Sequence, residues 1–546
     1  MEIILKKHLI SSIILFSFSW FWIGGIDTGF VGHPVGDLAD HAWGNNWFAA
    51  SLHAGEFPFW VRENYFPEEK VLWHIDPMGG LFRAIFWYIP GRMAWNLYII
   101  CALFFSALLL YGFAYDCHQN RSLALLLALM LQTSAFSSGL IHSGLSEYLN
   151  MGWGIALLWA LHRQRFWLAG IFLGLCGYQA FSYGIMGGLI SLFFVWKSKK
   201  KLWRTYLLAL LLIAPPLWVG WLSLTHPQAA FSGQQAPGWS YQSLPAIDLF
   251  GWFRMGDWVH PNTPAMGNPG ILQVHYLGWV ILGTCLWGGW KDKAARGWFK
   301  KISAVLVLSL GPRLSINRWM PLGGKLFLPL ALFYLPCFPF QMVHHPYRMM
   351  AFMLPLVLIG VGYGLKRVPI FAQLLLFGLY VTEQLQSPVD YPFLRANVEE
   401  NVGMEGARLD WPPDFSEPNR QYLLAQLKHH YPVVYGVNIW LPESVRKDAG
   451  VQRWLRLLDN PRERSQNRDM PALPIRKIYE ENVSDEPSTL DKMGIKWLVV
   501  HRKYLSDNEE NRLFHQLQKE FGMPLVQSKT QWVFQLTSER DEGVKK

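Results

Sequence analysis

The chain has 546 residues, of which 51% are hydrophobic and 15% aromatic, and its formal net charge is +10. A positive charge of this size indicates nucleic-acid binding only when it gathers on one soluble face. Here the basic residues lie largely in short turns between long apolar segments. The composition therefore excludes a soluble enzyme and gives no support to a nucleic-acid partner.

The apolar segments predict a mostly α, polytopic membrane protein. A bilayer crossing takes roughly 20 residues of helix, and on that basis we expect about 11 transmembrane helices. Only helices satisfy their own backbone groups inside the bilayer. The segment 166–196 is long enough for two helices, with a turn at its more polar centre, 178–183. The segments are 9–26, 94–115, 122–139, 149–161, 166–196, 202–224, 271–290, 302–311, 349–365 and 370–385.

Lysine and arginine mark alternate turns between these segments, as the positive-inside rule requires of cytoplasmic turns. They predict a cytoplasmic N-terminus, an uncleaved first helix and three large loops on the opposite side: 27–92, 225–270 and 312–348. Within the third loop, Pro329 and Pro336 interrupt an apolar stretch at 326–338. Because proline disrupts a spanning helix, we expect this stretch to be re-entrant or interfacial. If it crossed instead, the C-terminal tail would lie in the cytoplasm.

The tail has a different composition and predicts a small α/β domain. Strands are expected at 406–412, 494–501 and 531–536, and helices at 420–429 and 509–521. Ser506 and Glu509 have the spacing of a capping box at the start of the last helix. We therefore divide the chain into a transmembrane domain, 1–386, and an extracytoplasmic domain, 387–546.

Two carboxylates stand just after the first helix. Asp37 and Asp40 are three residues apart, so on a helix they would share a face. There they could act as a general base or hold a divalent cation such as Mg or Mn. The alternative is a solvated loop in which Asp37 caps a helix at 38–52. His41 fits an interfacial neighbour better than a ligand.

Further along the same loop, tryptophans surround a set of charged and polar residues: Glu56, Arg62, Glu63, His74 and Asp76. Acids and an arginine between aromatic rings suit sugar binding, because the faces of sugars stack on rings. The alternative is a belt of aromatic residues at headgroup depth.

A basic cluster, His344, His345 and Arg348, precedes the tenth segment on the side where the positive-inside rule gives no reason for positive charge. Arg348 and a histidine, with Arg313 or Arg318 nearby, could bind a lipid-linked phosphate. The alternatives are a lipid headgroup contact or a salt bridge to the outer domain. The adjacent histidines do not form a metal site, since no third ligand is near in sequence.

In layout the chain resembles the GT-C superfamily of integral-membrane glycosyltransferases, and among bacterial members the YfhO-like group. The motifs that carry the resemblance are the first-loop segments 36–43 and 55–60, the segment 344–364, and 276–278. The resemblance implies a bacterial inner-membrane enzyme that uses a polyprenyl-phosphate-linked sugar. It would make Asp37 or Asp40 the catalytic base or metal ligand, and would place Arg348 on the donor phosphate.

The first functional hypothesis is therefore transfer of a sugar from a polyprenyl-phosphate donor to a glycan or envelope-protein acceptor on the outer face of the membrane. The second is a non-enzymatic scaffold or export component whose tail binds envelope partners. Membrane lipid is an expected contact in both. Secondary transport is a weaker third, because the apolar segments contain few charges.

Overall fold

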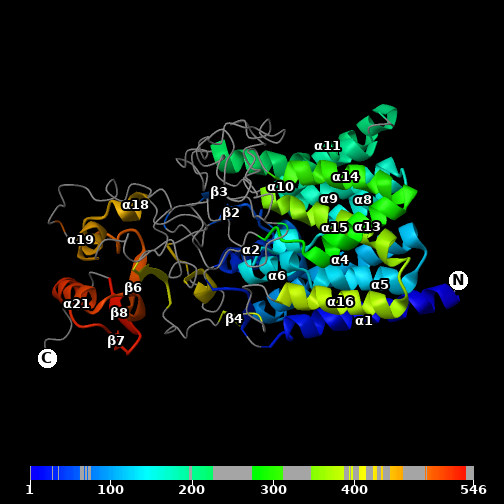
Figure 1. Ribbon diagram of the computed structural model, residues 1–546. Coiled ribbons are helices and arrows are strands. Elements are labelled where there is room, and N and C mark those ends of the chain that lie inside the picture. Colours follow the sequence, from blue (N-terminus) through cyan, green and yellow to red (C-terminus); the bar gives the residue numbers. More distant parts are fainter. Residues whose placement is uncertain are drawn as a thin grey trace, which may run out of the picture.

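The computed structural model describes residues 2–225 with gaps at 28, 35, 62–66, 68–69, 72–75 and 196–198, then residues 252, 274–310 and 346–385. In the C-terminal part it describes 393, 395–396, 405–412, 422–426, 432–434, 443–458, 486 and 488–536. A bundle of long helices forms one end of the molecule and a small sheet with its own helices forms the other (Figure 1). The described fold is mostly helical, as expected.

The bundle is centred on α15 (Met350–Leu365), all of whose residues are buried. A helix that is apolar all round belongs in the middle of a bundle. Around it lie α1 (Glu2–Ile23), α4 (Gly91–His118), α5 (Arg121–Gln132), α6 (Ala135–Ser143), α8 (Gly152–His162), α9 (Phe166–Gln179), α10 (Phe181–Val195), α11 (Lys199–Thr225), α13 (Trp279–Lys291), α14 (Lys293–Ser309) and α16 (Ile370–Leu385).

Three described helical segments are long and apolar enough to cross a membrane: 91–118, 121–143 and 203–222. Five shorter apolar helices accompany them. These segments support a membrane protein, while the number of crossings stays a prediction.

The helix boundaries confirm one expectation and correct two. Residues 166–196 contain two helices, which separate at the extended residue Ala180. The segment 122–139, expected as one helix, is divided between α5 and α6, and Ser134 caps the second. The basic stretch 291–301, expected as a turn, is largely helical, because Asp292 caps α14 and the helix continues from Lys293.

Several of the basic turns meet at one end of the bundle. Arg163 pairs with Asp116, and both Lys366 and Arg367 pair with Asp292. These contacts join turns that are far apart in the sequence. The N-terminus lies at the end of the bundle opposite the small sheet (Figure 1).

The C-terminal sheet has the strand order β5-β6-β8-β7. The strands are β5 (Ala407–Trp411), β6 (Ile495–His501), β7 (Val526–Gln527) and β8 (Gln531–Gln535), and only the β5–β6 pair is parallel. Helices α18 (Glu443–Arg446), α19 (Ala449–Leu457) and α21 (Asp507–Phe521) accompany it. The capping box of Ser506 and Glu509 is present. The expected strands and last helix are confirmed, whereas the domain boundary at 386/387 lies outside the described residues.

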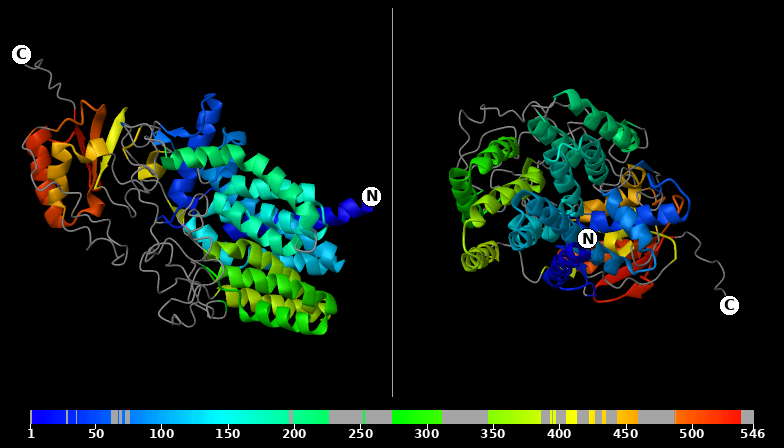
Figure 2. Two further views of the ribbon diagram at one scale, coloured as in Figure 1. Left: turned by 90° about the horizontal axis from the view of Figure 1, so that it is seen from above. Right: turned by 90° about the vertical axis from the view of Figure 1, so that its right-hand side faces the viewer.

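The first long loop lies between the bundle and the sheet (Figures 1 and 2). It contains β1 (Phe30–Val31), α2 (Leu38–His53), β2 (Trp60–Val61), β3 (Lys70–Val71) and α3 (Pro77–Ile85). β1 pairs with β4 (Arg395–Ala396), which ties this loop to the chain that follows the bundle.

Gly144 allows the start of α2 to dock against the end of α6. Its φ is +73°, and an added Cβ would lie 2.4 Å from the backbone nitrogen of Leu38. We expect Gly144→Ala to destabilise the fold by more than about 1 kcal/mol, through left-handed strain and backbone overlap. Thermal unfolding in detergent should show a lower midpoint. Gly283→Ala is the matched control, since nothing lies within 4 Å of its added Cβ, and equal stability of the two variants would contradict this account.

Candidate functional site

The start of α2 is held against the end of α6 by backbone hydrogen bonds. The amide of Asp37 donates to the carbonyl of Ser143 (2.8 Å), and the amide of His33 donates to the carbonyl of His142 (2.7 Å). Asp37 is the N-cap residue of α2, but its side chain makes no capping hydrogen bond. It is half-buried, whereas Asp40, in the first turn, is 9% exposed.

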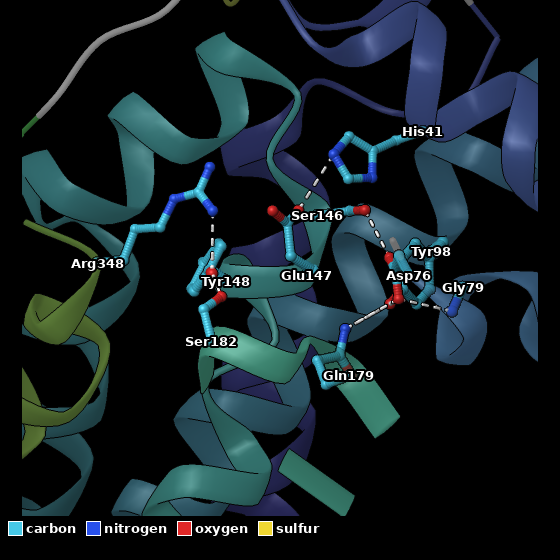
Figure 3. Close-up of polar contacts among 10 residues, drawn as sticks. All are labelled: His41, Asp76, Gly79, Tyr98, Ser146, Glu147, Tyr148, Gln179, Ser182 and Arg348. Atoms are coloured by element: carbon cyan, nitrogen blue, oxygen red, sulfur yellow. Dashed lines mark hydrogen bonds and ion pairs between the residues drawn. The ribbon is translucent and has the colours of Figure 1, made fainter. Parts of the chain in front are cut away.

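A short helix, α7 (Ser146–Leu149), contributes three consecutive side chains to the site (Figure 3). Ser146 donates to Asp76 Oδ2 (2.6 Å), and Glu147 Oε2 lies 3.3 Å from His41 Nε2. The hydroxyl of Tyr148 accepts from Arg348 Nη1 (3.0 Å). One turn of helix thus connects α2, α3 and the segment before α15.

Asp76 is a fully buried structural carboxylate. It caps α3 by accepting from the amide of Gly79 (2.9 Å). It also accepts from Tyr98 (3.1 Å) and Gln179 (3.0 Å), in addition to Ser146. Burial raises the pKa of Asp76 to about 6, against the opposing effect of these hydrogen bonds. With all its oxygens engaged, Asp76 is suited to positioning rather than to proton transfer.

His41 and Glu147 form a buried pair, 2% and 1% exposed. Burial lowers the pKa of His41, and the neighbouring carboxylates Asp37, Asp76 and Asp40 oppose that effect. Burial raises the pKa of Glu147 to about 7, while the positive charge of Arg348 acts in the other direction. Burial thus favours the neutral form of both side chains.

Arg348 belongs to a short 3-10 helix, η7 (Pro346–Met349), directly before α15. Its guanidinium lies over the ring of Tyr148, 4.5 Å from the centroid. The hydroxyl of Tyr148 in turn contacts Ser182 at the start of α10. Hydrogen bonding and stacking together fix the direction of the guanidinium.

The site therefore brings Asp37, Asp40 and Arg348 into one electrostatic environment. The charges of all three act on His41, and those of Asp37 and Arg348 act on Glu147. More than 300 residues separate the aspartates from the arginine in sequence. Asp37 and Asp40, at the start of α2, and Arg348, before α15, thus lie around α7.

The raised pKa of Glu147 predicts a pH-dependent stability. The folded carboxyl holds its proton more tightly than the unfolded one, whose pKa is near 4.5. Its contribution is therefore fully present below that value and is lost as the pH rises through about 7. We expect the unfolding midpoint to fall between pH 5 and pH 8, and Glu147→Gln to make the fall smaller. Glu56→Gln, which changes an exposed carboxyl, should keep the wild-type slope, and an unchanged slope in Glu147→Gln would contradict the assignment.

The other predicted site residues are placed as follows. Glu56 is exposed beyond the far end of α2, which is about 24 Å long at 1.5 Å per residue, so the helix separates it from Asp37 and Asp40. The other predicted contacts lie outside the described residues: Arg62, Glu63, His74, Arg313, Arg318, His344 and His345.

In the part of the chain that is described, no group of three or more His, Cys, Asp or Glu side chains could hold a metal ion. That Asp37 and Asp40 hold a divalent cation stays a prediction.

Sequence reasoning named Asp76 only among the acids suited to sugar binding, and it missed how the site is connected. Glu147 was recognisable only as a carboxylate at the edge of an apolar segment, a position that is often functional. Asp76 precedes Pro77, the arrangement typical of a helix N-terminus, and this was the available signal for its capping role. Nothing local in the sequence indicated that His41 would lie beside Glu147, or that Tyr148 would contact Arg348.

A scan against protein-family models found no match, and neither did a search of the curated proteins. Among solved structures, the chain is similar to the Archaeoglobus fulgidus oligosaccharyltransferase in complex with Zn and sulfate. The identity is 12%, the match covers 90% of this chain and 68% of that chain, and the TM-score is 0.42. It is also similar to the same enzyme tethered through a disulfide bond to an acceptor peptide containing the NVT sequon, with 11% identity, 91% and 69% coverage and a TM-score of 0.42. Similarity of this degree says nothing about activity, which has to be inferred from the side chains of the site.

Proposed function

We propose that the chain is a GT-C-type glycosyltransferase that moves a sugar from a polyprenyl-phosphate donor to an acceptor hydroxyl or amide at one face of the membrane. The observation that carries the proposal is that the start of α2, with Asp37 and Asp40, and Arg348 both lie against the chain at α7. Asp37 bonds to Ser143 through its backbone, His41 pairs with Glu147, and Arg348 bonds to Tyr148. A lipid-linked donor needs an apolar environment for its chain, a cation for its phosphate and a base for the acceptor. This site offers all three within one region.

In the proposed reaction the acceptor attacks the anomeric carbon of the donor sugar. Asp37 or Asp40 takes the proton from the acceptor as the new bond forms. The bond between the anomeric carbon and the phosphate oxygen breaks, and its electron pair leaves with the polyprenyl phosphate. Arg348 neutralises the phosphate charge that develops. Asp37 is the better base of the two, since it is more exposed than Asp40.

The remaining predicted contacts belong to the same proposal. Glu56 and Arg62 would bind sugar or acceptor, while Arg313, His344 and His345 would add to the phosphate site. A divalent cation, Mg or Mn, would use Asp37 and Asp40 as ligands. Membership of the bacterial YfhO-like group also stays a proposal.

We propose a multi-pass protein of the bacterial inner membrane with a cytoplasmic N-terminus and an extracytoplasmic tail. The gathering of basic turns at the end of the bundle away from the sheet supports this orientation. Alkaline phosphatase fused after Ser387 should be active, and fused after Lys201 it should be inactive. An inactive fusion after Ser387 would mean that residues 326–338 cross the membrane.

Release of polyprenyl phosphate tests the function without knowledge of the sugar, since every such donor yields this product. Purified protein in lipid vesicles would be incubated with a panel of polyprenyl-phosphate sugars and an envelope extract as acceptor. We expect release that depends on both donor and extract. A scaffold, the alternative function, would bind envelope partners and release none.

A further inference from the structure

α3 exposes an apolar face close to the start of a candidate membrane span. Leu81, Ile85 and Tyr88 are 44%, 76% and 95% exposed. Residues 81, 85 and 88 are spaced by four and three positions, so the first two share a face of the helix and the third continues it into the following turn. Only Ile89 and Pro90 separate Tyr88 from the beginning of α4.

The opposite face of α3 is packed tightly against α2. A Cβ added to Gly79 would lie 2.6 Å from the side chain of Asn45, and one added to Gly80 would lie 2.7 Å from the ring of Phe48. Arg83 of α3 donates to the side chain of Asn46 on α2 (3.2 Å). Because this face is fixed, the exposed residues cannot turn inward.

Charged side chains also form hydrogen bonds with the backbone at both ends of α3. Asp76 accepts from the amide of Gly79 at the first turn. Arg83 donates to the carbonyls of Phe86 and Trp87, the two residues directly after the helix, both at 2.9 Å. Its guanidinium also lies 4.7 Å from the centre of the Trp87 ring. Each such hydrogen bond lowers the cost of placing the backbone at this helix's ends in an apolar surrounding.

We propose that α3 lies in the headgroup region of the membrane leaflet on the side of the candidate site, with Leu81, Ile85 and Tyr88 inserted among the lipids. Because the chain runs from Tyr88 almost directly into α4, a 28-residue candidate span, this face lies near the N-terminal end of that span. Amphipathic helices of this kind lie in the plane of the interface with their apolar face buried in it. Since Asp76 joins α3 to Ser146 and Gln179, the inserted helix sets the depth of the site in the membrane. The proposal does not depend on glycosyl transfer.

Photo-crosslinking in lipid vesicles tests this placement. A benzophenone amino acid would replace Ile85 or Tyr88 in the full-length protein, and mass spectrometry would identify what it captures. Leu375, 57% exposed on the apolar helix α16, is the positive control, and Leu525, 59% exposed in the C-terminal part, is the negative control.

We expect phospholipid adducts at positions 85 and 88 as at 375, and none at 525. The absence of lipid adducts at positions 85 and 88 would overturn the proposal. Crosslinks to protein alone at these positions would overturn it as well. Reading the adduct needs no turnover, so the result is independent of whether the chain transfers sugars. The adduct at 375 shows that the protein inserts into the vesicles, and the unfolding midpoint of each variant checks its folding.

Discussion

Asp37→Asn should lower the rate of polyprenyl-phosphate release roughly 100- to 10,000-fold, the usual effect of removing a general base. Asparagine has nearly the same shape as aspartate but cannot accept the acceptor's proton. The structure gives a reason to expect intact folding, because the Asp37 side chain makes no capping hydrogen bond to α2. Replacing a side chain of this kind usually changes stability by under about 0.5 kcal/mol. The measurement is the release rate at saturating donor, with the unfolding midpoint as the check on folding.

Two variants make this result interpretable. Asp27→Asn changes an exposed aspartate of the same loop and should release product at the wild-type rate. Asp40→Asn tests the other candidate base, and a loss there with full activity in Asp37→Asn would exchange their roles. Full activity in the double variant would exclude the proposed mechanism.

Arg348→Ala should weaken donor binding roughly 10- to 100-fold, since a charge-assisted hydrogen bond contributes about 1.5–3 kcal/mol. The guanidinium is held by the hydroxyl and ring of Tyr148, so it can offer two parallel donors to a phosphate. Lysine keeps the charge but not this geometry, and Arg348→Lys should restore only part of the affinity. The KM for the donor should rise more than the KM for the acceptor.

Arg367→Ala is the control for the loss of an arginine. Arg367 pairs with Asp292, away from the candidate site, and its removal should leave the donor KM unchanged. Equal donor affinity in wild type and Arg348→Ala would assign Arg348 to headgroup contact or to structure.

Much of the helical architecture could be predicted from the sequence because apolar segments of sufficient length leave few alternatives. The separation of α9 from α10 was also visible, since the polar residues near Ala180 interrupt the apolar run. The separation of α5 from α6 was not. The amide of Ala135 donates to the side chain of Gln384, 249 residues away, and such a partner has no local signature.

The candidate site shows the same limit. Asp37 and Asp40 were identifiable from their spacing just after the first helix, and Arg348 because topology gives no reason for positive charge there. The family resemblance implied that they act in one site, but the residues of α7 that bring them together could not be predicted. Glu147 and Tyr148 each find partners more than 100 residues away, in His41 and Arg348. Only the folded chain reveals that one helical turn holds both sides of the site.

The central claim is that a lipid phosphate binds at Arg348, facing the start of α2. The most direct test is a cryo-electron microscopy structure of the wild-type protein in nanodiscs containing polyprenyl phosphate. We predict phosphate density within hydrogen-bonding distance of Arg348, on the side that faces Asp37, with the polyprenyl chain along the apolar bundle. A well-resolved Arg348 without phosphate density, or a phosphate bound elsewhere on the protein, would contradict the account.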